Sequence, residues 1–252
     1  MGAQPLESLQ PAKPEASPSA SAVLQDFVYQ HLKSTGRNNA DVRTDNQAIA
    51  NDQGGNTTAH RIIKLDHQMQ QDLAQGRPIS AAEMAASEQL HAKSKGFTKV
   101  DAKMDRDAIG QDPTDANGER AAIKSDQKAL KLHGLSPKLR AAVQTDLTQK
   151  RALLANETGD TSDESRYLRH DQTADRTGDR LATAIRSHNP ADIKAALKAD
   201  VAAQGAKGTD YRQDTASERG YISADDLNTR QNALIAQALK TDPYAHLTRH
   251  GR

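Results

Sequence analysis

The chain contains no cysteine and no tryptophan, and only two phenylalanines and five tyrosines among its 252 residues. Without cysteine it can form no disulfide, no thiolate metal site and no thiol nucleophile. Leu, Ile, Val and Phe together number 39, about 15% of the chain, so little material is available for a large apolar core. We therefore expect small helical units of marginal stability.

Long apolar runs and charge of one sign are also missing. No stretch approaches the ~18 apolar residues that a membrane-spanning helix needs, and the N-terminal residues lack the apolar segment of a signal peptide. The 34 basic and 33 acidic residues are interspersed along the chain. Because nucleic acid selects for a one-sided positive surface, we expect no nucleic-acid binding. The lack of a long apolar run predicts no membrane span. We expect the partner to be a protein.

The acidic residues are unequally divided, with 25 aspartates and 8 glutamates. The short aspartate side chain competes with the backbone for hydrogen bonds, so it favours caps and turns over helix interiors. We therefore expect many aspartates at helix starts and in the loops between helices.

Composition divides the chain into five parts. Residues 1–19 carry four of the nine prolines and are predicted to be a disordered leader. Residues 20–56 are predicted to form an N-terminal helix and a polar linker, 57–155 a helical domain, and 156–241 a second helical segment. Residues 242–252 are predicted to be a flexible tail.

The spacing of apolar residues predicts an all-α fold, with helices joined by polar loops rich in Asp and Gly. The polar stretch 34–56 is one such loop, because it is rich in Gly and Asn. The predicted helices span 21–33, 57–75, 80–94, 98–109, 119–133, 136–155, 164–186, 190–203 and 223–240.

Capping signals support several of these helix starts. The clearest is Ser80 with Glu83, which matches a capping box, and Ser21 is the predicted N-cap of the first helix. Two further boxes with aspartate in place of glutamate, and two N-caps before a first-turn proline, are predicted at Ser223–Asp226, Thr98–Asp101, Ser136–Pro137 and Asn189–Pro190.

An Arg-x-Asp triplet recurs at 43–45, 169–171 and 212–214. Its spacings of 126 and 43 residues differ, whereas a solenoid needs a fixed period. We interpret the triplets as convergent use of good helix caps, with an old duplication of a helix–loop–helix unit as the alternative.

The stretch 219–227 resembles the second half of an EF-hand calcium loop. Gly220 would supply the sharp turn and Asp226 the final ligand. The early ligand positions do not match, because one of them is Arg219, whose charge repels a cation. We expect no calcium binding tighter than about millimolar at this loop.

No metal site is therefore assigned, and calcium is the one cofactor kept open. Its candidate ligands are Glu218 and Asp226 in this stretch, and Asp105 and Asp107 in a second acidic stretch over 105–112. Capped helix starts after acidic turns explain the same residues without a metal.

Two short motifs resemble those of phosphohydrolases. His170–Asp171, with His133 before it and Asp200 after it, resembles the metal-binding order of all-α HD-type enzymes. Arg249–His250–Gly251 resembles the signature of histidine phosphatases, and we interpret it as a chance match. The HD-like pair lies in a strongly polar stretch, so we assign no catalytic residue and interpret the chain as non-enzymatic.

The leader, the absence of cysteine, the thin core and the many aspartates together resemble substrates of type III or related bacterial secretion systems, including harpin-like proteins. The resemblance implies a helical interaction protein that acts as a secreted effector or secretion accessory factor, exported by a non-classical route or kept in the cytoplasm. The alternatives are a calcium-responsive, EF-hand-like helical module and a hydrophilic stress-type protein that stays largely unfolded.

Overall fold

The computed structural model describes residues 19–159, 161–242 and 244, and only the backbone of 112, 156–159 and 161–162. The predicted disorder of residues 1–18 lies outside the described residues. So does most of the predicted 242–252 tail, including Arg249–His250–Gly251.

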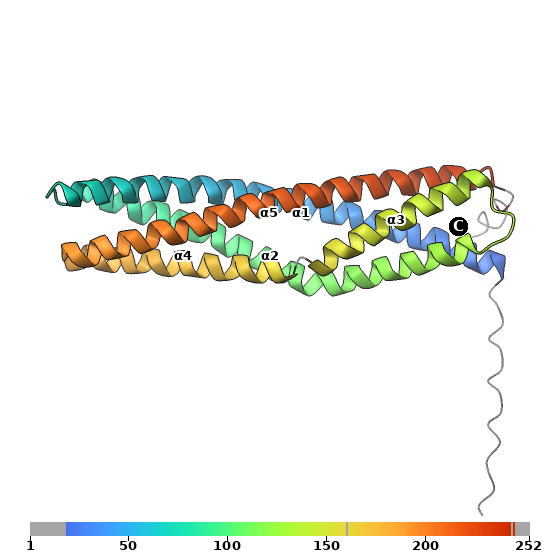
Figure 1. The fold of residues 1–252 in the computed structure, drawn as a ribbon, viewed down its shortest axis with the longest axis horizontal. Coiled ribbons are helices and arrows are strands. Elements are labelled where there is room, and N and C mark those ends of the chain that lie inside the picture. The colour runs from blue at the N-terminus through green and yellow to red at the C-terminus, as the bar shows by residue number, and fades with distance from the viewer. Residues whose placement is uncertain (1–18, 160, 243, 245–252) are drawn as a thin grey trace, which may run out of the picture.

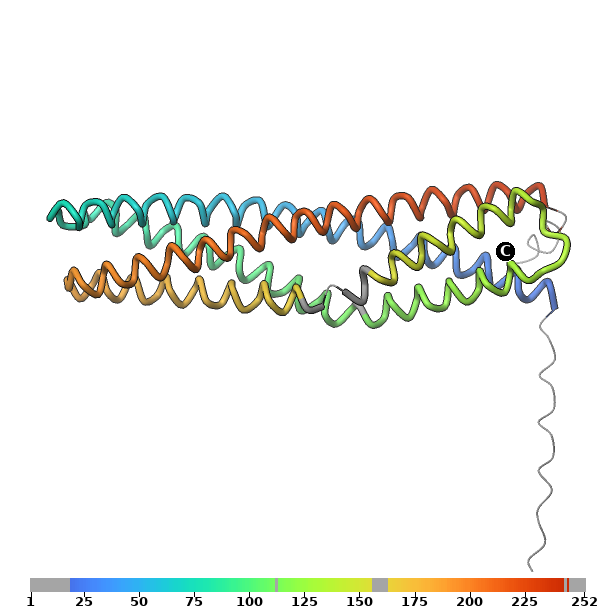
Figure 2. Tube along the Cα trace, viewed as in Figure 1, coloured from blue at the N-terminus to red at the C-terminus, as the bar shows by residue number. Residues whose placement is uncertain are grey.

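The described chain is all-α, as predicted, and contains five helices and no strand. They are α1 (Ala20–Ala74), α2 (Ala81–Leu130), α3 (Pro137–Gly159), α4 (Thr161–Ser187) and α5 (Pro190–Leu239). The chain runs up and down an elongated four-rod bundle, in which α3 and α4 lie end to end as the third rod (Figures 1 and 2). None of the described helices has the length and apolar character of a membrane span.

The predicted polar linker over 34–56 is wrong, because these residues form the middle of α1. The predicted breaks within α2 and α5 are also helical. Consequently the segments predicted as separate, 57–155 and 156–241, contribute helices to one bundle, in which α1 packs along α5. Gly, Asn and Asp weaken an isolated helix, but packing against three other rods overrides that preference.

Glycines inside α1 bring the rods together at positions where a larger residue would collide. A Cβ atom on Gly55 would lie 2.5 Å from the ring of Tyr211 in α5. The neighbouring Gly54 faces the Phe97 ring of α2 at similarly short range. Gly54 and Gly55, which were predicted to lie in a linker, therefore allow α1 to pack closely against α2 and α5.

We expect Gly55→Ala to destabilise the bundle by about 1–3 kcal/mol, because the added methyl group overpacks the contact with Tyr211. Gly36→Ala is the matched control, since a Cβ there meets nothing within 4 Å. This control should stabilise α1 by about 0.5–1 kcal/mol through helix propensity. Urea unfolding followed by circular dichroism measures both changes, and equal effects at the two positions would contradict the packing role.

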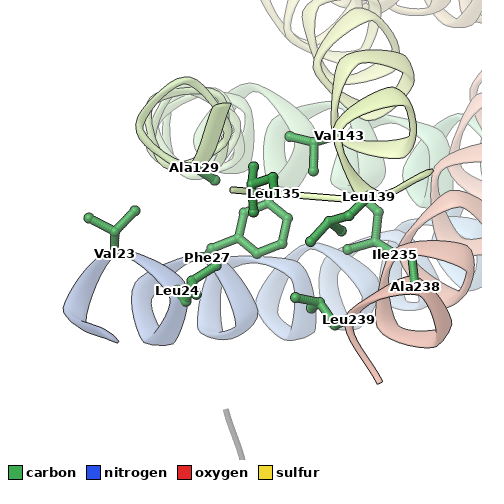
Figure 3. Packing of buried hydrophobic residues seen from close by; sticks show 10 residues of the cluster. All are labelled: Val23, Leu24, Phe27, Ala129, Leu135, Leu139, Val143, Ile235, Ala238 and Leu239. Carbon is green, nitrogen blue, oxygen red and sulfur yellow. The ribbon is translucent and has the colours of Figure 1, made fainter. Parts of the chain in front are cut away.

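Apolar side chains gather at the two ends of the bundle. At one end, a cluster from α1, α2, α3 and α5 surrounds Phe27 and Leu139 (Figure 3). At the other end, Met69 packs with Leu181 and Leu197. The stretch between the two clusters has a different, polar core.

The buried positions follow a heptad repeat along the whole bundle. In α1 the inward positions alternate four and three residues apart and are Phe27, His31, Ser34, Asn38, Asp41, Asp45, Ala48, Asp52, Gly55, Ala59, Ile62, Asp66, Met69 and Leu73. This is the spacing of left-handed coiled-coil packing, in which these positions are usually apolar. Here the central ones are mostly polar, so a search for apolar periodicity finds the helix ends and misses the middle.

The expected location of the aspartates is therefore corrected. Thirteen described aspartates are buried, and all but Asp242 lie within helices. The described connections, residues 75–80, 131–136 and 188–189, contain no aspartate.

Three of the predicted helix starts are confirmed. Ser80 and Glu83 form the capping box at the start of α2, and Asn189 caps α5. Ser136 accepts from the backbone N–H of Leu139 at 3.3 Å, at the start of α3. The first cap is Ser19, whose hydroxyl accepts from Ala22, and not the predicted Ser21.

The boxes predicted at Ser223–Asp226 and Thr98–Asp101 are wrong, because both lie inside continuous helices. The N–H groups there are already bonded within the helix, so a side-chain cap has nothing to satisfy.

Ser80→Ala should cost about 1 kcal/mol of unfolding free energy, because it removes an N-cap. Ser223→Ala should be neutral within about 0.5 kcal/mol, since this exposed serine lies inside α5. Thermal unfolding of the two variants side by side measures the difference. Equal losses would show that α5 begins a new helix near residue 223.

Candidate functional site

The core contains a buried ionic cluster in the half formed by α3. The Lys150 ammonium lies 2.5 Å from Asp146 Oδ2 and 3.2 Å from Asp126 Oδ2, and all three side chains are fully buried. His31 Nε2 lies 2.9 Å from Asp146 Oδ2, and Asn228 donates to Asp146 Oδ1 at 2.9 Å. The histidine and two aspartates are close enough to hold a metal ion, but Lys150 lies among them and supplies the positive charge.

The two carboxyl groups of this cluster are not equivalent. Burial raises the pKa of Asp126 to about 8, against the opposing charge of Lys150. Burial also acts to raise the pKa of Asp146, but the hydrogen bond from His31 and the charge of Lys150 outweigh it and leave the pKa below its usual value. The same cluster therefore raises the pKa of one aspartate and lowers that of the other.

A second cluster lies in the half formed by α4. His91 Nε2 is 2.8 Å from Asp200 Oδ2, and Thr177 donates to Asp200 Oδ1 at 2.7 Å. Burial acts to lower the pKa of His91, but the Asp200 carboxylate outweighs it and raises that pKa. Beside this pair, burial and the adjacent Asp200 raise the pKa of Asp66 to about 9.

Lys207 supplies the buried positive charge in this half. Its ammonium lies 3.4 Å from Asp171 Oδ1 and donates to Ser94 Oγ at 3.2 Å. It also donates to the hydroxyl of Thr98. In each half of the bundle, one buried lysine thus compensates the charge of buried aspartates: Lys150 in the half formed by α3 and Lys207 in the half formed by α4.

An acidic cavity of about 450 Å³ lies between the two clusters. Ten carboxylate residues line it, together with a single lysine, Lys103. The carboxylates are Asp41, Asp45, Asp101, Asp105, Asp107, Asp115, Glu164, Asp214, Glu218 and Asp225. They come from α1, α2, α4 and α5, so the site exists only in the assembled bundle.

Burial and mutual repulsion raise the pKa values of the carboxyl groups in and beside this cavity. The pKa of Asp105 is raised to about 11 and that of Asp101 to about 10, first by burial and then by neighbouring carboxylates. The pKa of Asp225 is raised to about 8 and that of Asp41 to about 7 for the same reasons. Strongly raised pKa values in a cavity are a mark of functional sites.

The four calcium candidates from the sequence have different locations. Asp105, Asp107 and Glu218 line the cavity, whereas Asp226 is exposed on the outside of α5. The EF-hand-like stretch is not a loop, because residues 215–226 are helical. An EF-hand wraps a cation with a turning backbone, so that geometry is absent here.

The HD-like residues do not form one site. His170 Nδ1 pairs with Asp210 Oδ2 at 2.5 Å, whereas Asp171 lies against Lys207. Asp200 is bound to His91 and Thr177, and the backbone carbonyl of His133 accepts from the Tyr244 hydroxyl.

Sequence reasoning missed Asp52, Asp101 and Asp214 as site residues. One of the three, Asp214, had a signal in the sequence, because it belongs to an Arg-x-Asp triplet. Each triplet places its aspartate at an inward heptad position: Asp45, Asp171 and Asp214. The triplets therefore mark a repeated core position, which also explains their irregular spacing on different helices.

An apolar groove of about 250 Å³ lies between α1 and α5 near the Phe27 cluster. Val28, Leu32, Ala236 and Leu239 line it. Leu32, at the edge of the groove, is 70% exposed. Neither a family model nor a curated protein nor a solved structure matches this chain, so the candidate sites rest on their own geometry.

Proposed function

We propose that the protein is a non-enzymatic helical interaction protein, whose bundle opens so that α1 and α5 bind a helix of a protein partner. The observation that carries this proposal is the polar core. A coiled-coil core built from Asp, Asn, Ser and His specifies register but contributes little hydrophobic stabilisation. Among the described residues, the buried apolar side chains gather into clusters at the two ends of the bundle.

The groove between α1 and α5 supports the choice of these two helices. Its lining is apolar, and its exposed Leu32 leaves apolar surface for the apolar face of an amphipathic helix. Separation of α1 from α5 would extend this surface to the buried Phe27 and Ile235.

A reversible lock tests whether opening is needed. Asn232 donates to Thr35 Oγ1 at 3.0 Å across the α1–α5 contact, so Thr35→Cys/Asn232→Cys places two thiols on facing helices, and this variant is oxidised to form a disulfide there. The chain has no other cysteine, so this bond is the only disulfide that can form within one molecule. Chemical cross-linking in cell extract should capture the same partner with wild type and with the reduced variant.

The oxidised variant should lose that partner by at least about tenfold, because its helices cannot separate. The reduced form carries the same two substitutions and is the matched control. Capture that is equal in the oxidised and reduced forms would contradict opening, and so would the absence of any captured partner in all three samples.

Export as a secreted bacterial effector is the finer part of the proposal. A bundle of marginal stability costs little to unfold before passage through a narrow channel, and residues 1–19 resemble secretion leaders in composition. The protein should accumulate in the medium when a specialised secretion system is induced, and in the cytoplasm when the system is deleted. Equal retention in both strains would favour a cytoplasmic role.

The acidic cavity favours a second candidate, a cation-responsive helical module that does not use EF-hand geometry. A hydrophilic stress-type protein is a third hypothesis, and far-UV circular dichroism tests it directly. A largely unfolded chain would give a weak helical signal, whereas the folded bundle should give a strong one.

A further inference from the structure

Three buried aspartates from three different helices meet beside the acidic cavity. Asp52 of α1, Asp101 of α2 and Asp214 of α5 each offer a carboxylate oxygen, and these oxygens lie within 4.8 Å of one another. Asp105, one helical turn from Asp101, lies in the wall of the cavity with Glu164 and Glu218. The four aspartates belong to adjacent layers of the heptad core.

Two of these carboxyl groups have buried oxygens that accept no hydrogen bond. Asp52 is fully buried, and its Oδ2 accepts from Thr215 at 3.3 Å while its Oδ1 has no donor. Asp105 is 3% exposed, its Oδ2 also accepts no hydrogen bond, and its carboxyl group lies against that of Glu164. The buried hydroxyl of Tyr211 next to them has no partner either. Buried polar atoms are normally satisfied, so these atoms indicate a missing ligand.

The bundle itself provides the comparison that identifies the ligand as a cation. Lys150 lies between Asp126 and Asp146, and Lys207 lies against Asp171. By contrast, no Lys, Arg or His in the described part of the chain lies within 4.0 Å of the carboxylates of Asp52, Asp101 or Asp105. Clustered carboxylates repel one another unless a positive charge or protons compensate them.

We propose that Asp52, Asp101 and Asp214, with Asp105 beside them, bind one hard divalent cation and prefer calcium to magnesium. Ligands that are all oxygen suit hard cations. Calcium binds oxygens at about 2.3–2.6 Å, so one ion can hold oxygens up to about 4.6–5.2 Å apart. Side chains from separate helices meet this flexible geometry more readily than the strict octahedron of magnesium.

The proposal does not depend on the binding of a protein partner, because it concerns the isolated bundle. Isothermal titration of the full chain with calcium chloride at pH 7 should show about one site per chain, with a Kd below about 100 µM. Magnesium chloride should bind at least about tenfold more weakly. Calcium should also raise the melting temperature, because the assembled cavity exists only in the folded state.

Asp52→Asn and Asp101→Asn should each weaken calcium binding by at least about tenfold and remove the calcium-dependent rise in melting temperature. Both variants should fold, since an amide replaces a buried carboxyl group without its charge. Circular dichroism in the absence of calcium checks this. Asp226→Asn is the matched control, because Asp226 is exposed on the same bundle and belongs to the EF-hand-like stretch.

Terbium provides a second measurement of the same site. The chain has no tryptophan, so tyrosine must sensitise terbium emission, and Tyr211 lies next to the aspartates. Emission should appear on binding and should be displaced by calcium. The proposal is overturned if millimolar calcium gives neither heat nor a thermal shift, if Asp52→Asn and Asp101→Asn bind calcium like wild type, or if Asp226→Asn abolishes binding.

Discussion

The free energy of unfolding should be highest near pH 5 and should fall by several kcal/mol between pH 5 and pH 8. Three buried carboxyl groups outside the proposed cation site carry this expectation. The pKa is raised to about 9 for Asp66 and to about 8 for Asp126 and Asp225, in each case mainly by burial. Each group contributes about 1.4 kcal/mol per pH unit over the range in which only the folded state keeps its proton.

The direction follows from proton uptake on folding. Above about pH 4 the unfolded chain has released these protons, whereas the folded chain still holds them. Their contribution is therefore complete at low pH and is lost as the pH rises towards the folded pKa values. The raised pKa of His91 acts in the same direction, because its contribution is present below about pH 6.5 and is lost as the pH rises through the folded pKa.

The lowered pKa values of Asp146 and Asp200 set the acid limit. Their stabilising contacts with histidine require the ionised carboxylate, so their contribution is lost as the pH falls below about 4. Together the two sets of groups place the maximum in the mildly acidic range.

Urea unfolding at pH 5, 6, 7 and 8 in the presence of EDTA measures this profile. Asp66→Asn is the diagnostic variant, because an amide resembles the protonated acid beside Asp200. It should be more stable than wild type at pH 8 and should reduce the pH slope by about 1.4 kcal/mol per unit. A wild-type protein that gains stability from pH 5 to pH 8 would show that these groups ionise in the folded state.

Lys150→Met should destabilise the bundle by about 3–5 kcal/mol at pH 7. The substitution keeps the size of the side chain but removes the ammonium that lies against Asp126 and Asp146. The loss of one partner leaves buried negative charge uncompensated, which costs far more than an intact buried pair contributes. The effect should shrink at pH 4.5, because the remaining carboxyl groups then take up protons.

Two controls make this result specific. Lys95→Met removes an ammonium that lies 2.6 Å from Asp179 on the surface, and it should cost less than about 1 kcal/mol. Lys150→Met/Asp146→Asn should recover part of the lost stability, because it removes the charge that Lys150 balanced. A Lys150→Met protein as stable as wild type at pH 7 would mean that Lys150 does not carry a positive charge in the core.

The candidate site was only partly predictable from the sequence. Asp105 and Glu218 were identified as acidic residues near glycines, and both line the cavity. They were assigned to separate loops, and nothing in the sequence shows that α2 and α5 bring them to the same cavity. Asp52 gave no local signal, because an aspartate in a polar stretch has the same pattern whether it faces solvent or the core. Asp101 was interpreted as part of a capping box with Thr98, and it lies inside α2.

By itself, the amino-acid sequence determined the all-α class and the starts of three helices. These features depend on contacts within a few residues, such as Ser80 with Glu83 and Asn189 with Ala191. The tertiary structure alone decided the length of α1, α2 and α5 and the burial of the aspartates. A polar residue at a heptad position is buried only when three other rods cover it. Lysine, histidine or carboxyl groups on those rods then determine the charge of the buried residue.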